Sequence, residues 1–99
     1  MFFIKVMSSY RYVVAMCDSD LLGKKFESGK FQLDVKESFY KGEEVDEERA
    51  IQIIRKMAIE DATFNIVGKN SVALALKEGI IVEKGIGEIQ GIPFALVLL

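Results

Sequence analysis

The sequence predicts an α+β fold, a two-layer sandwich in which two helices pack on one face of a mainly antiparallel sheet of hairpins. Runs rich in β-branched and aromatic residues at 2–7 and 11–17 flank a short polar turn, as in a hairpin. Polar and apolar residues alternate through 24–35 around Ser28 and Gly29, which predicts a second hairpin. Strand–strand runs outnumber strand–helix–strand units, and this order favours the α+β class.

The whole chain, 1–99, is expected to form a single domain. Its 99 residues are 51% hydrophobic and 28% charged, with eight glycines and one proline. A domain typically needs about 100 to 150 residues, so the chain has room for one core. The composition excludes a disordered chain, a collagen-like repeat and a disulfide scaffold.

Local signals place the elements that follow the first hairpin. Asp18 and its two neighbours supply N-cap chemistry for a short helical turn over 21–22, which Gly23 ends. Phe39 and Tyr40 suggest a further short strand. In the second hairpin, the side chains expected to point into the core are those of Phe31, Leu33 and Val35.

The clearest helix covers about 46–60. The acidic stretch 43–48 starts it, because negative charge complements the positive end of the helix dipole. Apolar residues recur at helical spacing and form one stripe that packs on the sheet, while Gln52, Arg55 and Lys56 lie on the solvent side. The stripe consists of Ala50, Ile51, Ile54, Met57 and Ala58.

The second half predicts a buried strand at 63–67 and a largely enclosed helix at 71–78, closed by Gly79. A further short strand is expected at 80–82, and one parallel crossover within 63–82 would make the sheet mixed. Turns are expected at Gly85, Gly87 and Gly91. The closing strand is placed at 94–99, with Pro93 at its edge.

Cysteine usage and the terminus indicate a soluble cytoplasmic protein without a membrane partner. Cys17 is the one cysteine, so no disulfide forms within the chain, and a reducing compartment fits best. The amino-terminal run has Lys5 inside it and lacks a signal-peptide core. The longest apolar stretch, 92–99, is far shorter than the ~18 residues that a spanning helix needs.

The residue types favour a non-catalytic protein without a cofactor. The chain has no histidine, which is the usual proton-transfer group near neutral pH, so no catalytic residue is assigned and a zinc site is close to excluded. Cys17 precedes Asp18, whose charge would raise the thiol pKa, and this favours a buried structural cysteine beside an N-cap. The acidic stretch 43–48 matches no calcium loop and fits a solvated helix start.

The most suggestive local feature is the predicted strand-to-helix junction at Gly68, Lys69, Asn70 and Ser71. Exposed backbone N–H groups and the helix dipole make such a junction able to bind phosphate or an RNA backbone. It lacks the spacing of a P-loop. The alternative is a turn at Gly68 with Asn70 or Ser71 as the helix cap.

A second candidate is a strip of basic residues interleaved with aromatic ones, a pattern used to bind single-stranded RNA. Strands with one core face and one solvent face produce the same alternation. The isoelectric point near 5.2 lies below that of an electrostatic nucleic-acid binder, and no DNA partner is predicted. The strip consists of Lys24, Lys25, Lys30 and Lys41 with Tyr40.

Several segments, in order, resemble a small archaeal family of conserved single-domain proteins of unknown function. They are VAMCD at 14–18, LGK at 22–24, FYKGE at 39–43, NIVG at 65–68, SVALA at 71–75 and GIPFA at 91–95. The resemblance implies an α/β domain of the archaeal cytosol with a link to translation or RNA, and no established catalytic residues. Similar proteins tend to carry histidine where this chain has Phe94, so a role that needs that imidazole is not expected here.

We therefore expect a binding or adaptor module associated with RNA or with ribosomal and translation proteins. One alternative is a small enzyme or binding protein for a phosphorylated metabolite at the 68–71 junction, with Lys69 neutralising charge and Asp18 or Glu43 moving protons. Another is a structural homodimer that uses its apolar final strand as an edge-to-edge interface.

Overall fold

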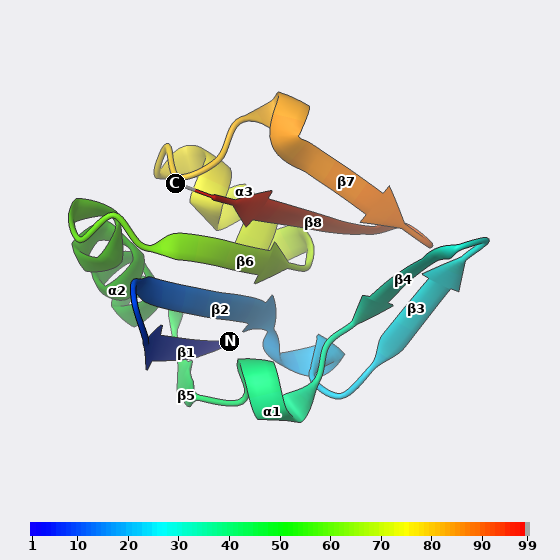
Figure 1. Ribbon diagram of the computed structural model, residues 1–99, viewed down its shortest axis with the longest axis horizontal. Helices are drawn as coiled ribbons and strands as arrows, with labels where there is room; N and C mark the ends of the chain where they lie inside the picture. The colour runs from blue at the N-terminus through cyan, green and yellow to red at the C-terminus, as the bar shows by residue number, and fades with distance from the viewer. Residues whose placement is uncertain (99) are drawn as a thin grey trace.

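The computed structural model describes residues 1–98 and contains one six-stranded sheet with the order β5-β1-β2-β6-β8-β7, together with a separate two-stranded hairpin (Figure 1). The α+β prediction is confirmed. The strands of the large sheet are β1 (Phe2–Ser8), β2 (Tyr12–Asp18), β5 (Glu43–Val45), β6 (Thr63–Val67), β7 (Ile86–Ile89) and β8 (Ile92–Val97).

Neighbouring strands are antiparallel except for β2 and β6, which form the parallel pair in the middle of the sheet. The prediction of a crossover within 63–82 was wrong, because the crossover is the much longer segment between β2 and β6. Residues 80–82 form no strand. The backbone N–H groups of Ile80 and Ile81 instead donate to the Ala75 carbonyl and close the preceding helix.

Two helices cover one face of the sheet, as predicted. Helix α2 (Glu47–Ile59) begins at Asp46, whose carboxylate accepts from the Arg49 amide at 2.9 Å. Helix α3 (Lys69–Lys77) ends before Gly79, which has φ of 74°. Both contribute to a core that includes the buried side chains of Met16, Ile54 and Ile66. Within residues 1–98, no helix is long and apolar enough to cross a membrane.

A smaller apolar cluster lies on the opposite face, where Ala15, Cys17 and Val67 point. It is covered by the 3-10 turn η1 (Ser19–Leu21) and by helix α1 (Glu37–Tyr40). The prediction of a strand at Phe39 and Tyr40 was wrong. The Tyr40 amide donates to the Lys36 carbonyl, which makes a helical turn that directs the Tyr40 ring into this cluster.

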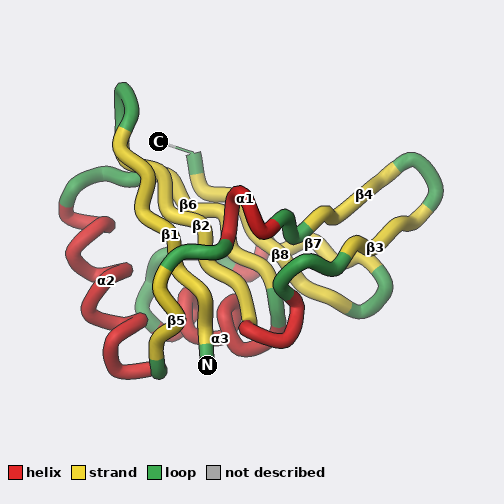
Figure 2. Tube along the Cα trace, turned by 90° about the horizontal axis from the view of Figure 1, so that it is seen from below, coloured by secondary structure: helices red, strands yellow, loops and turns green. Residues whose placement is uncertain are grey.

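The second hairpin, β3 (Lys25–Ser28) and β4 (Phe31–Asp34), forms an arm that projects from the body (Figures 1 and 2). Val35 is buried and Leu33 is half-buried, as predicted, but Phe31 is 74% exposed. Its inward prediction was wrong because the arm tip has no sheet beneath it. The Gln90 side chain donates to the Glu27 carbonyl at 2.6 Å and connects the arm to the turn between β7 and β8.

The carboxyl-terminal part differs from expectation in two ways. Gly87 was predicted in a turn but lies inside β7, where a Cβ atom would come within 2.5 Å of the Phe94 ring. The homodimer alternative requires the final strand at a sheet edge, but β8 lies between β6 and β7, with Pro93 inside the strand and opposite Glu88. The final residue of the predicted closing strand, at position 99, lies outside the described residues.

Strand β5 is the edge strand, but it covers only part of its neighbour β1. Its three residues were expected to start the helix, but they pair with residues 2–4 of β1. Among the described residues, no strand pairs with the outer edge of β1 past Ile4 (Figure 2). Gly42 packs directly on β1 at this point, because a Cβ atom there would lie 2.1 Å from the Ile4 carbonyl oxygen and 2.6 Å from the Lys5 Cα.

Replacing Gly42 by alanine is therefore expected to destabilise the fold by about 1–3 kcal/mol, because the added methyl group overpacks the contact with β1. Urea unfolding would measure the loss. Gly85→Ala is the matched control, since an added Cβ at Gly85 meets nothing within 4 Å. Equal stability of the two variants would contradict the close contact.

Candidate functional site

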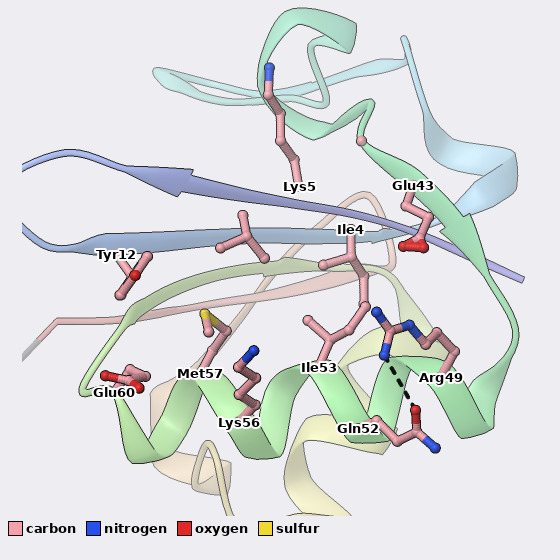
Figure 3. A pocket seen from close by; sticks show the side chains of 12 residues that line it. Ile4, Lys5, Tyr12, Glu43, Arg49, Gln52, Ile53, Lys56, Met57 and Glu60 are labelled. Carbon is pink, nitrogen blue, oxygen red and sulfur yellow. Dashed lines mark hydrogen bonds between the residues drawn. The ribbon is translucent and has the colours of Figure 1, made fainter.

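A groove of about 570 Å³ runs between α2 and the outer edge of β1 (Figure 3). Its apolar surface comes from Ile4 and Val6 of β1 and from Ile53 and Met57 of α2. Ile54, one residue along the helix, faces the core and is fully buried, so the helix holds its groove-facing residues firmly. Tyr12 lies at one end of the groove and Glu43 at the other.

Charged and polar side chains of α2 form the rim of the groove. Arg49, Gln52, Lys56 and Glu60 line it and are exposed. The Arg49 guanidinium donates to the Gln52 side-chain oxygen at 3.3 Å, which orients the arginine along the helix (Figure 3). Lys56 lies over the middle of the groove, Arg49 lies at the same end as Glu43, and Glu60 lies at the other end near Tyr12.

The β1 wall of the groove includes the part of the strand that β5 leaves uncovered. Lys5 lies just before this part, beside Gly42, and its side chain points to the other face of the sheet, where its Nζ donates to the Ser38 carbonyl at 3.0 Å (Figure 3). Val6 points to the groove side and is 42% exposed. An apolar surface therefore adjoins a strand edge that lacks a neighbouring strand.

The predicted anion site at the start of α3 holds an internal carboxylate. Asp18, at the end of β2, accepts from the Asn70 amide at 3.1 Å and from the Ser71 amide at 2.8 Å. It also accepts from the Ser71 hydroxyl at 2.7 Å. The position expected for a phosphate is thus occupied by Asp18, which is 5% exposed, while Lys69 and Asn70 lie at the surface.

Asp18 was predicted to cap the short turn that follows it, and it occupies the N-cap position of η1. Its side chain makes no capping bond to η1 and caps α3 instead. Neither Asn70 nor Ser71 is the N-cap, which is Gly68. A Cβ on Gly68 would lie 2.4 Å from the Asp18 carboxyl carbon, and Gly68 has φ of 112°, so both contact and conformation require glycine.

The predicted basic strip is divided between two parts of the molecule. Lys24, Lys25 and Lys30 lie on or beside the projecting arm, whereas Lys41 follows α1 and forms an ion pair with Glu37 at 3.6 Å. Tyr40 is buried and its ring packs edge-on against Phe39. It is therefore not available to stack on a base, and the exposed aromatic ring of the arm is that of Phe31.

The thiol and phenol in the smaller apolar cluster are held in their neutral forms. Burial raises the pKa of Cys17 to about 12, and the charge of Asp18 adds to this effect. Burial likewise raises the pKa of Tyr40 to about 12. Cys17 is thus a poor nucleophile at neutral pH, as its sequence context predicted.

The groove was not found from the sequence. Gln52 and Lys56 were correctly placed on the solvent side of a helix, and the strand around Val6 was recognised. Nothing in their local pattern shows that the helix lies along an uncovered strand edge. The short length of β5 creates that arrangement, and the acidic residues of β5 predict a helix start instead of a strand.

The comparisons with known proteins identify the family. A family profile described as "Protein of unknown function (DUF424)" matches residues 7–99. The chain belongs to the DUF424 family. This confirms the resemblance noted from the sequence, and a family so described assigns no activity to the groove.

A solved structure gives the same fold for a relative of this DUF424 chain. It is described as an uncharacterized conserved protein from Methanopyrus kandleri, an archaeon, and is 26% identical. The match covers 97% of this chain and 89% of that chain, with a TM-score of 0.82. No curated protein matches the sequence.

Replacing Asp18 by alanine is expected to lower the free energy of unfolding by about 2 kcal/mol, because it leaves the Asn70 and Ser71 amides without their acceptor. Urea unfolding and hydrogen exchange at these two amides would measure the effect. Asp20→Ala is the control, since Asp20 is an exposed neighbour in η1. Unchanged exchange at Ser71 in the Asp18 variant would rule out the cap.

Proposed function

We propose that this DUF424 protein is a non-catalytic adaptor that binds a segment of a partner protein in the groove between α2 and β1. The observation that carries the proposal is the apolar groove surface beside a strand edge without a neighbour. Proteins commonly bind peptides at such edges, where the backbone supplies affinity and adjacent pockets supply selectivity. We place this adaptor in the cytoplasm, in keeping with its one cysteine, which is unpaired and buried.

The polar groups support a protein partner over a phosphorylated metabolite. Sites for small molecules enclose most of the ligand and aim a few polar groups at it. Here the polar side chains of the groove, such as Gln52 and Lys56, stand exposed along a rim. The metabolite alternative also relied on the amides at the start of α3, which already donate to Asp18.

The groups that were considered for proton transfer do not share a site. Asp18 accepts three hydrogen bonds at the start of α3, and Glu43 lies at the end of the groove. The Cys17 thiol lies in the smaller apolar cluster with a pKa of about 12. This separation favours binding over catalysis.

A photo-crosslinking amino acid at Gln52 is expected to join the protein to a discrete partner in its native cell extract, because Gln52 is exposed on the groove rim. The same group at Lys77 is the matched control, since Lys77 is exposed at the end of α3. Mass spectrometry would identify the crosslinked peptides. Identical adducts from both positions, or none from Gln52, would contradict a partner in the groove.

A second candidate function is contact with RNA of the translation apparatus through the arm. The observation that favours it is the tip, where exposed Phe31 adjoins Lys30 on a hairpin that stands away from the body. An exposed ring beside a cation fits the stacking used in single-strand binding. Because the protein as a whole carries a net charge of −2, which does not attract RNA, we place this contact on the arm alone.

Recovery of the tagged protein at low and at moderate salt would test the RNA contact. Ribosomal or transfer RNA is expected at low salt and less as the salt rises, because phosphate contacts release counterions. Lys30→Glu combined with Phe31→Ala should remove this RNA, whereas Lys84→Glu, at another exposed lysine, should not. RNA that persists in the double variant would exclude the arm.

A further inference from the structure

We infer that the groove takes an acidic, extended peptide segment, which adds to the sheet as a strand against the uncovered edge of β1. This inference rests on the proposed function and specifies the chemistry of the partner. It is carried by three features of the groove: the strand edge, the apolar surface and the distribution of charge.

The strand edge supplies the backbone contacts. β1 has seven residues, and its outer neighbour β5 pairs only with residues 2–4. Gly42 of the preceding chain lies against Ile4 and Lys5, so among the described residues it is residues 6–8 that have no strand beside them. Backbone groups along an uncovered edge are a template for another strand, and an added segment here would continue the line of β5.

Exposed edges are often protected by a lysine, and Lys5 lies just before the uncovered part. However, its ammonium group is held on the opposite face by the Ser38 carbonyl at 3.0 Å. The side of the edge that faces α2 presents Val6 instead. The arrangement thus differs from a charged edge that repels other strands.

The apolar surface supplies selectivity for an extended conformation. Side chains of a strand alternate between the two faces of a sheet, so every second side chain of an added strand would face α2. Those side chains would meet Ile53 and Met57 of the helix and Val6 of β1. Valine or isoleucine at alternate positions fits this surface, because β-branched residues favour strands.

The charge distribution selects acidic residues for the intervening positions and the flanks. Lys56 lies along the middle of the rim, Arg49 lies at the end with Glu43, and Lys5 lies on the other face of the same edge. Among the described residues, no carboxylate lies within 4.0 Å of the Lys56 ammonium group. An acidic segment would give these cations partners, whereas a basic one would be repelled.

The test uses two synthetic six-residue peptides with capped ends, one alternating glutamate with valine and one alternating lysine with valine. NMR titration of the labelled protein is expected to shift the amide resonances of residues 6–8 with the glutamate peptide. The lysine peptide should bind at least about tenfold more weakly, which corresponds to about 1.4 kcal/mol. Arg49→Glu combined with Lys56→Glu, at two exposed positions, should reverse this preference.

N-methylation of the glutamate peptide tests strand addition without altering the protein. Methyl groups on alternate amides of one peptide edge should abolish binding, while methyl groups on the other edge should be tolerated, since only one edge of a strand faces β1. Equal loss from both methylated peptides, or no shift at residues 6–8, would overturn strand addition. Equal binding of the lysine peptide would overturn the acidic preference.

The crosslinking result separates this inference from the proposed function. Adducts at Gln52 together with unshifted amides at residues 6–8 would retain the groove as a protein-binding site and exclude strand addition. No adduct at Gln52 would remove both. A concentration-dependent dimer that protects residues 6–8 from hydrogen exchange would replace the acidic segment by a second copy.

Discussion

The Asp18 carboxylate holds the two halves of the molecule in register. Asp18 is the last residue of β2, and its carboxylate accepts hydrogen bonds at the start of α3. Its partner Ser71 lies 53 residues farther along the chain. The parallel pairing of Cys17 with Val67 brings Asp18 beside Gly68, where the missing side chain makes room for the carboxylate. Hydrogen bonds to an ionised group are among the stronger ones, and a buried charge requires such partners.

The central parallel pair then determines which parts of the sheet are accessible. β6 and β8 occupy one side of β2, so β1 is left on the other side, toward the edge. The chain returns to that edge only briefly, in β5, before Asp46 starts α2. The groove is therefore the gap that remains where a long strand has a short neighbour and a helix lies alongside.

Elements with strong local signals were predictable from the sequence. The two hairpins, β6 and α2 each carry an alternation, an apolar run or a cap that acts within a few residues. Short elements that depend on distant partners were not. The acidic residues 43–45 suggest a helix start, yet pairing with β1 makes them a strand. Phe31 fits an alternating pattern that predicts a buried side chain, but it lies at the tip of the arm, where no sheet covers it. The sequence did not predict the contact of Asp18 with Ser71 or the α2–β1 groove, because each of them joins segments that are far apart in the chain.

The interior position of β8 has a consequence for how the protein is made. β8 follows all of its neighbours in the chain, and it joins β7 to β6 through pairs such as Ala95 with Ile66. Earlier segments fold first during synthesis, so β6 presents an unpaired edge until residues 92–97 are available. A chain without β8 would therefore present β6 as an open strand edge, which is a template for pairing with other chains.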